Sequence, residues 1–385
     1  MKQGMTFEDL LTRVEHEAAS RRDYYVPTQE MYLMTDQSGS RLATPCGQFS
    51  LKETAHLHLG ELCGIDRRYY QRLRLEAPFL LDRNVNHWLA NNSPRQRIVR
   101  ALESDTGSEA RAIVSSRYAM LDNDALLKTV EPVIREQGLT VESCNVSDEK
   151  LVIKMVSPRL RGEVKVGDEV QAGIIIRNSE VRCSAVEVDW FVKRLVCTNG
   201  MIVTGPHGRG AFRRHVGRDW NAPRRKAQSF SWHGATPSHN ALQQLTSSAA
   251  ALPSSSPVPA NLEREQWERA IWEQLQASLR QSLNADAFTS LLNRLALTTT
   301  LQAQLAPEEL TERVGNSFHL SPDEQSMVLF HLTQDSDLSL WGVLNAVTRT
   351  SQEVKSYARA TALEEIGGDL SRLTAPQWNR LTTPN

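Results

Sequence analysis

The feature that most constrains this chain is a long segment without a single charged residue. From Ser229 to Asn261 the sequence SFSWHGATPSHNALQQLTSSAAALPSSSPVPAN is rich in Ser, Pro and Ala and contains no Lys, Arg, Asp or Glu. A segment of this composition has little to bury and is typical of a flexible linker. We therefore divide the chain into residues 1–228, a Ser/Pro-rich linker of residues 229–261, and residues 262–385.

Charge separates along the same boundary. Residues 262–385 carry 10 Lys/Arg and 16 Asp/Glu, a net charge of −6. The residues before them carry 34 Lys/Arg and 29 Asp/Glu, a net charge of +5, so the formal total of −1 combines a basic front with an acidic back. Such asymmetry indicates a nucleic-acid partner for the front, or pairing of front against back between subunits.

Before the linker, helical patterns come first. Ser50–Glu53 reads as a capping box that begins a helix, and Gly64 ends that helix. Asp66 can cap the next helix, through Arg67–Leu75. His56 and His58 lie in the first of these helices, two positions apart, and therefore diverge too far to share a metal ion. We expect them on a partly exposed polar face.

From about Lys150 the pattern changes to strands. The runs LVIKMV, VQAGIIIRN and VRCSAVEVDWFVKRLVC are rich in β-branched residues and are separated by turn residues. In the longest run we expect a buried face and a polar face that carries one aromatic residue. The buried face would hold Val186, Val188, Trp190 and Val192, and the polar face Glu187, Asp189, Phe191 and Lys193.

After the linker, the periodicity predicts helices. Glu263–Leu283 is amphipathic, with Trp267, Ile271 and Leu275 on one stripe, and Ser321 begins another helix. A further helix over about Leu338–Gly367 would end at a glycine pair that suits a left-handed cap. The predicted fold class is α+β: a helix-flanked, antiparallel-rich sheet in a basic N-terminal domain, then a linker and an acidic, all-helical C-terminal region.

Bulk composition limits the setting. The N-terminal residues include acids, and no run of about 18 apolar residues is present, so we expect neither a secretory signal nor a membrane span. The five cysteines are scattered and form no CxxC pair, which is typical of reduced thiols in a cytoplasmic protein. We expect no metal and no cofactor.

The stretch CTNGMIVTGPHGRGAFRRHVGRDWNAPRRK, from Cys197 to Lys226, concentrates positive charge against a single acid, Asp219. Clustered Lys and Arg neutralise phosphates, and aromatic residues among them can stack on bases. The alternative is a solvated loop whose arginines pair with the acidic C-terminal region. The stretch lacks GxxxxGK[ST] and the dinucleotide-binding GxGxxG context, which makes a conventional nucleotide site a poor fit.

Three sets of residues form the predicted nucleic-acid site. The phosphate contacts are Arg209, Arg213, Arg214, Arg218, Arg224, Arg225 and Lys226. Residues that would extend this surface are Arg111, Arg117, Arg177, Lys193 and Arg194, with Arg97, Arg100 and Tyr118 nearby in sequence. Candidates for base stacking are Phe191, Phe212 and Trp220.

Several of these segments carry a resemblance to a known family. The ordered motifs SLKETAHLHLGELCGIDRRYYQRL, NVNHWLANN, ARAIVSSRYAMLDNDALL, GIIIRNSE and VDWFVKRLVCTNGM, and the tail LSLWGVLNAVTRTSQEVKSYARATALEEIGGDL, resemble a phage- and plasmid-like family known as a domain of unknown function, number nine-three-two. The resemblance covers roughly Phe49–Val203 and Asp337–Leu370. It implies a gene carried by a mobile element and supplies no catalytic residue.

We expect a cytoplasmic, mobile-element protein that binds nucleic acid, with single-stranded DNA favoured, for annealing, protection or recombination. The acidic helices would then serve self-association into a homo-oligomer or contact with a host protein. A second hypothesis is a non-enzymatic inhibitor or scaffold that binds a host defence or replication protein. A third is a Mg²⁺-dependent nuclease that uses Glu187 and Asp189, although alternating charges are also ordinary on an exposed strand.

Overall fold

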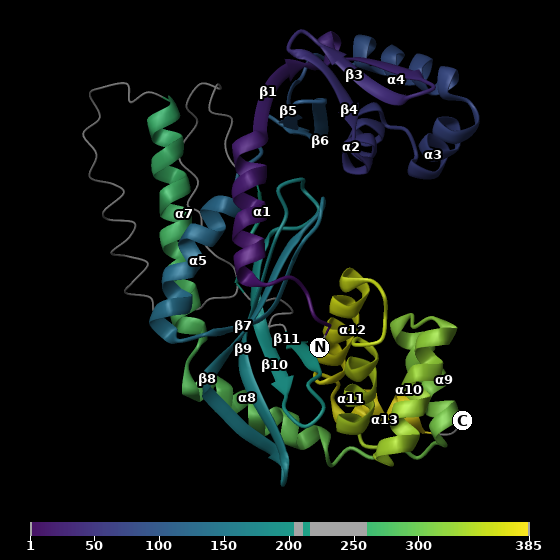
Figure 1. The fold of residues 1–385 in the computed structure, drawn as a ribbon. Coiled ribbons are helices and arrows are strands. Elements are labelled where there is room, and N and C mark those ends of the chain that lie inside the picture. Colours follow the sequence, from purple (N-terminus) through teal and green to yellow (C-terminus); the bar gives the residue numbers. More distant parts are fainter. Residues whose placement is uncertain (1, 204–210, 216–259, 384–385) are drawn as a thin grey trace.

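The computed structural model describes residues 2–203, 211–215 and 260–383. They form two sheets of six strands each, with helices packed against them, followed by a helical region (Figure 1). This confirms the predicted α+β fold, with two sheets in place of one. No helix among the described residues is long and apolar enough to cross a membrane.

The first sheet has the strand order β1-β5-β6-β4-β3-β2. Strands β4 and β6 run parallel, and all other neighbours run antiparallel. Helices α2, α3 and α4 share one buried core with this sheet, which includes Leu33, Leu59 and Leu81. The elements are β1 (Arg21–Pro27), a 3-10 turn (Thr28–Glu30), β2 (Tyr32–Asp36), β3 (Gly39–Thr44), β4 (Gly47–Leu51), α2 (Glu53–Cys63), α3 (Arg67–Glu76), α4 (Pro78–Asn91), β5 (Gln96–Ser104) and β6 (Gly107–Ser115).

Local sequence explains the ends of these helices. Gly64 adopts a left-handed φ of 68° after α2, as predicted, and the Asp66 side chain accepts hydrogen bonds from the backbone of Arg68 and Tyr69 at the start of α3. The predicted capping box at Ser50 is wrong. Ser50 lies in β4, and α2 begins at Glu53 without a side-chain cap, because pairing with β6 extends the strand through Leu51.

The second sheet has the order β11-β10-β9-β8-β7, and the short strand β12 also pairs with β10. Its neighbours are antiparallel throughout. On one face it packs against α1 and α5. The elements are α1 (Phe7–Ser20), α5 (Asn123–Gln137), β7 (Thr140–Val146), β8 (Leu151–Lys165), β9 (Asp168–Asn178), β10 (Val186–Arg194), β11 (Gly200–Val203) and β12 (Ala211–Arg213).

Both faces of strand β10 are covered, which corrects the prediction of one polar face. Val186 and Val188 pack into the core formed with α1 and α5, as expected. On the opposite face Phe191 is fully buried beside Ile175 and Ile202, and Tyr357 of the C-terminal region packs against them. One face of β10 would be exposed if residues 1–228 were considered alone. Residues much later in the chain cover it.

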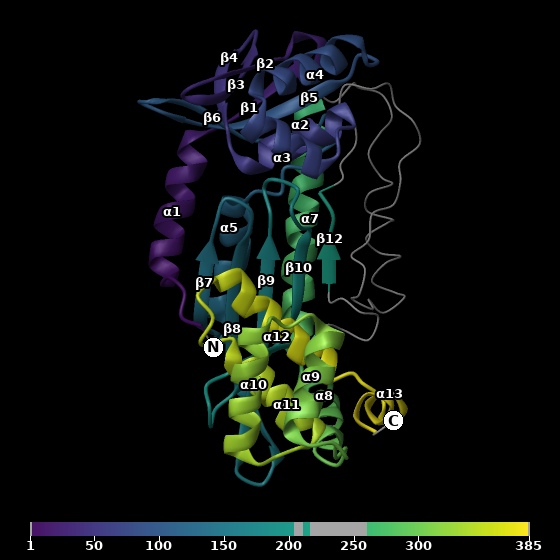
Figure 2. The same cartoon turned by 90° about the vertical axis from the view of Figure 1, so that its right-hand side faces the viewer.

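The C-terminal helices are α7 (Ala260–Ser282), α8 (Ala285–Thr298), α9 (Pro307–Phe318), α10 (Pro322–Asp335), α11 (Leu340–Thr350), α12 (Tyr357–Leu370) and α13 (Ala375–Thr382). They complete the cores of the second sheet (Figure 2). Ile271 and Leu275 of α7 belong to the same core as Ile153 of β8, and Leu344 of α11 belongs to the same core as Val192 of β10. The boundary at the linker thus does not separate two independent cores.

Two details of this region differ from the prediction. The single helix expected over Leu338–Gly367 is divided into α11 and α12. Gly367 and Gly368 lie inside α12 and do not adopt a left-handed conformation. Their role is close packing, because a Cβ on Gly368 would overlap the carbonyl oxygen of Ile202 in β11. The helix start predicted at Ser321 is confirmed, and the structure adds a capping box that Glu324 completes.

Candidate functional site

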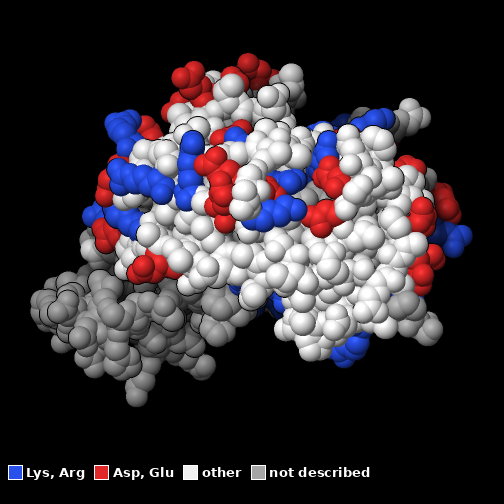
Figure 3. All heavy atoms as spheres, turned by 90° about the horizontal axis from the view of Figure 1, so that it is seen from below, with Lys and Arg blue, Asp and Glu red and all other residues white. Residues whose placement is uncertain are grey.

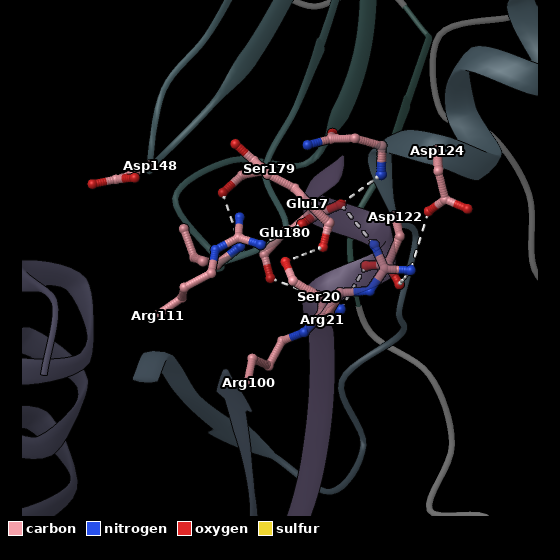
Figure 4. A network of polar contacts seen from close by, with 12 residues as sticks. Glu17, Ser20, Arg21, Arg100, Arg111, Asp122, Asp124, Asp148, Ser179 and Glu180 are labelled. Carbon is pink, nitrogen blue, oxygen red and sulfur yellow. Dashed lines mark hydrogen bonds and ion pairs between the residues drawn. The ribbon is translucent and has the colours of Figure 1, made fainter. Parts of the chain in front are cut away.

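A buried network of charges joins the first sheet to the second (Figure 4). Arg111 of β6 lies 2.8 Å from the carboxylate of Glu180, just after β9. Arg100 of β5 lies 2.7 Å from the carboxylate of Asp122, just before α5, and also donates to the carbonyl oxygen of Glu180. Arg21, the first residue of β1, contacts Asp122 and Glu180 at 3.2 and 3.3 Å.

The carboxylate of Asp122 in this network stays ionised. Burial alone would raise the pKa of Asp122, but the charges of Arg100 and Arg21 outweigh it and hold the pKa below its ordinary value. Arg100 is only 2% exposed and has carboxylates on both sides. Removing one partner of such a buried set typically costs about 3–5 kcal/mol. The network therefore fixes how the two sheets meet.

His215 of the basic stretch is anchored at the same junction. The ring nitrogens of His215 lie 3.0 Å from the carbonyl oxygen of Ala119 and 2.9 Å from the side-chain oxygen of Asn178. Its ring stacks on Tyr118, with centroids 5.0 Å apart. The Asn178 amide donates in turn to Asn123. Segments from three parts of the chain meet here, and Arg214 projects beside them as an exposed residue.

A cleft of about 950 Å³ opens at this point. Its walls come from the end of β6, from the loop between β9 and β10, from the residues after β12, and from α12. The charged residues that line it are Lys150, Arg177, Arg182, Arg214 and Arg372, against Glu187, Glu365 and Asp369. A smaller hollow of about 400 Å³ shares Lys150, Arg177 and Glu365 with it and continues toward Tyr357 of α12.

Arg177 forms ion pairs with Glu187 and Asp189, the two acids that suggested a nuclease. Its guanidinium lies 3.1 Å from Glu187 and also forms ion pairs with Asp189 and with Glu365 of α12. Asp189 is buried. Within residues 2–203, 211–215 and 260–383, no group of three or more His, Cys, Asp or Glu side chains is placed to hold a metal ion. In this arrangement the two carboxylates hold an arginine.

Two other predicted phosphate ligands also have acid partners. Lys193 lies 2.6 Å from Glu142 of β7. Arg194 forms a bidentate pair with Asp168, whose carboxylate also accepts from the indole nitrogen of Trp341 at 2.8 Å. Like Arg111 and Arg177, these cations are engaged inside the protein. They shape the walls of the site and have little charge left for a ligand.

The remaining predicted residues fall into three groups. Arg117 and Arg214 are exposed. Phe191 is fully buried and has no surface to offer a base, whereas Phe212 and Arg213 lie on β12, which pairs with β10. The residues outside the described part of the chain are Arg209, Arg218, Arg224, Arg225, Lys226 and Trp220.

The two histidines of α2 are buried, where we expected partial exposure. Nδ1 of His56 lies 2.9 Å from the hydroxyl of Tyr70, and Nδ1 of His58 accepts a hydrogen bond from the backbone of Ile113. Burial lowers the pKa of each to about 4. Both rings are therefore neutral at physiological pH and serve the core of the first sheet.

Sequence reasoning missed several exposed aromatic residues on α3 and α4. Tyr69, Phe79 and Trp88 are 51%, 67% and 41% exposed, and the Arg83 guanidinium lies 5.4 Å from the centre of the Phe79 ring. Exposed arginines of the same two helices are Arg67, Arg68, Arg72 and Arg83. The sequence RRYYQRLR already combines four arginines with two tyrosines, but we interpreted it only as a helix.

Comparison with known proteins confirms the family resemblance. Residues 110–244 match the model of a domain of unknown function (DUF932). The matched segment contains the motifs SSRYAMLDN and GIIIRNSE, which supply Tyr118, Asp122, Asn178 and Glu180 to the junction. No curated protein and no solved structure matches the chain significantly.

Proposed function

We propose that the protein binds single-stranded nucleic acid, with DNA favoured, along the cleft between the two sheets and α12. The observation that carries the proposal is the position of Arg214. It is an exposed residue of the basic stretch that also lines the cleft of about 950 Å³. Lys150, Arg182 and Arg372 also line that cleft, whereas Arg177 is engaged by its three acid partners. The basic residues predicted from the sequence to contact phosphates, Arg218, Arg224, Arg225 and Lys226, follow Arg214 in the chain.

The charge distribution elsewhere supports this choice of surface. On the face shown in Figure 3, Lys and Arg alternate with Asp and Glu around a wide uncharged area, so its described residues gather no patch of one sign. A polyanion is bound by excess positive charge with few acids nearby. Basic residues that line a concave surface meet this need better than the mixed charges of that face.

Exposed aromatic residues supply the second requirement of single-strand binding. Stacking on a side chain contributes about 1–3 kcal/mol per base and does not depend on base identity. Tyr69, Phe79 and Trp88 present open rings among arginines and are better placed for this than the buried Phe191. We propose that they, together with Phe212 or Trp220 of the basic stretch, contact bases.

The wider role that fits this activity is annealing or protection of single strands for a phage or plasmid. We propose that the acidic C-terminal region then serves self-association or contact with a host protein. Helices α7–α12 already pack on the second sheet, so their outer faces would provide such contacts.

The test is a salt titration of binding to fluorescent single-stranded and double-stranded oligonucleotides. With about five phosphates contacted on a single strand, log K should fall against log salt with a slope near −3.5. Replacing Arg213 and Arg214 by Ala should weaken binding of all sequences alike and reduce the slope by about 1.4. The matched control replaces Lys128 and Arg135, which are 77% and 82% exposed on α5 and do not line the cleft. Binding that does not respond to salt would contradict the proposal.

A protein partner is the second candidate, and one observation favours it. Leu75, Phe79 and Leu80 are 81%, 67% and 53% exposed near the end of α3 and the start of α4. Adjacent exposed apolar side chains often mark a protein-binding surface. Capture of a partner from nuclease-treated lysate that Leu75→Ser abolishes, while oligonucleotide binding persists, would separate this candidate from the first.

A further inference from the structure

Arg97 of β5 has no partner for its charge. Among the described residues its side chain forms no ion pair and no hydrogen bond, and its Nε atom is buried without a partner. This differs from Arg100 and Arg111 of the same sheet, which contact carboxylates. A buried polar nitrogen without a partner is costly, and most such nitrogens in folded proteins are satisfied.

The neighbours of Arg97 are also cations. Burial lowers its pKa below the ordinary value, and the charges of Arg95 and Arg182 lower it further. Arg95 is exposed and likewise forms no ion pair among the described residues. Three guanidinium groups are thus brought together with repulsion between them. An arrangement of this kind becomes favourable when an anion is added.

Arg182 is held in place at an energetic cost. Its φ of 65° lies in the left-handed region, which is unfavourable for a side chain of this size. Its backbone nitrogen donates to the Tyr118 hydroxyl, and its guanidinium contacts Glu61 of α2. That ion pair is exposed, with Arg182 and Glu61 side chains 48% and 62% accessible. Exposed pairs contribute little, so Arg182 can exchange Glu61 for a ligand.

The position of Arg97 connects these groups to the cleft. In the pairing of β5 with β6, Arg97 lies opposite Ser115, so the two side chains point to the same side of the sheet. Ser115 and Arg182 both line the cleft of about 950 Å³. Arg95 lines a separate hollow of about 210 Å³ together with Trp88. Arg97 thus lies two positions after Arg95, which lines the smaller hollow, and opposite Ser115, which lines the cleft together with Arg182.

We propose that Arg95, Arg97 and Arg182 form a phosphate-binding site at this end of the cleft. Guanidinium groups donate to phosphate oxygens in a fork geometry, and one phosphate would relieve the repulsion among the three. The identification of the ligand as a phosphate of a bound strand rests on the proposed function. The anion site itself stands on the three arginines alone.

The experiment measures thermal unfolding with and without inorganic pyrophosphate, against sodium chloride of equal ionic strength. A ligand that binds the folded protein raises the Tm as its concentration passes the Kd. We expect a pyrophosphate-dependent rise in the wild type and its loss in Arg97→Gln. Without pyrophosphate, Arg97→Gln should unfold no earlier than the wild type, because it removes an uncompensated charge. Arg182→Gln, at an exposed position, should also lose the pyrophosphate-dependent rise in Tm. It replaces Arg97→Gln as the test variant if Arg97→Gln does not fold.

Arg294→Gln is the matched control. Arg294 of α8 also has a buried Nε without a partner, and burial and Arg372 lower its pKa, but it lies outside the arginine cluster. It should keep the full response to pyrophosphate. A wild type that does not respond, an Arg97→Gln protein that responds fully, or an equal loss in Arg294→Gln would each overturn the proposal.

Oligonucleotides with and without a 5′-phosphate then identify the source of the phosphate. An equal loss of affinity for both in Arg97→Gln assigns the site to internal phosphates of a strand, and a loss for the phosphorylated form alone assigns it to an end. A pyrophosphate response without binding of any oligonucleotide would refute the proposed function and leave the site standing. If Arg97→Gln leaves oligonucleotide binding unchanged, the assignment of this site to a bound strand is refuted and the proposed function stands.

Discussion

The ammonium group of Lys154 in β8 and the carboxylate of Glu364 in α12 form an ion pair with neither side chain exposed to solvent. The ammonium also lies 4.9 Å from the centre of the Tyr357 ring. This pair fixes a C-terminal helix to the face of the second sheet that also holds Arg177. The linker joins these elements in sequence, and this contact joins them in space.

Breaking this pair should destabilise the protein strongly. Glu364→Gln leaves a buried ammonium without its counter-charge, and we expect a loss of about 3–5 kcal/mol in the free energy of unfolding. Replacing both residues by Met should cost much less, because no charge is then left buried. Urea unfolding of Lys154→Met, of Glu364→Met and of the variant that carries both changes measures the coupling between the two residues. Equal losses in the single and double variants would contradict this account.

The junction between the sheets can be tested with two neighbouring acids. Asp122→Asn removes the partner of buried Arg100 and should cost about 3–5 kcal/mol. Asp124→Asn removes a more exposed acid that contacts Arg21 and Lys128, and should cost less than about 1 kcal/mol. Chemical denaturation monitored by tryptophan fluorescence gives both values. If the two variants are equally stable, the network does not hold the sheets together.

Acid should destabilise the protein through His56 and His58. Their pKa values of about 4 lie below the ordinary value of 6.5, so below pH 6.5 the unfolded chain binds protons that the folded protein does not. Stability should therefore fall as the pH is lowered from about 6.5 toward 4, by up to about 1.4 kcal/mol per pH unit for each histidine. His56→Gln combined with His58→Gln should flatten this slope, and His16→Gln, at an exposed position, should not.

Gly368 should tolerate no side chain. A Cβ there would overlap the backbone of Ile202, which is rigid, so Gly368→Ala must displace α12 from β11. We expect a loss of at least about 1–3 kcal/mol, typical of overpacking. Gly315→Ala is the control, because a Cβ in α9 would meet only the flexible side chain of Gln325. Thermal unfolding that ranks the two variants equally would argue against this tight contact.

Local features of the fold were predictable from local sequence. Gly64 and Asp66 act within a few residues of themselves, as does the helix start at Ser321, and the structure confirms all three. The predicted burial of Val186 and Val188 is also confirmed, because the alternation of apolar and polar residues along a strand indicates which face is buried. The division of the predicted helix near Thr350 was not predictable, since TSQEVKSY has no proline or glycine to end it.

The candidate site depended on contacts between distant segments. Phe191 and Arg177 read as exposed because their covering helix, α12, begins more than 150 positions later. An arginine in a sequence carries no sign of whether a carboxylate will meet it. Glu180 pairs with Arg111, whereas Arg97, fourteen residues earlier, has no acid partner in the described part of the chain, and only the folded arrangement distinguishes them.

The way the second sheet ends has a consequence for how copies of the chain can associate. Beyond β10 the described sheet finishes in two short strands, β11 and β12, of four and three residues. Long, flat edge strands expose a row of unpaired backbone groups that can recruit the strand of another molecule, whereas very short ones offer few. Two copies of the chain are thus discouraged from joining into a continuous β-structure at this edge.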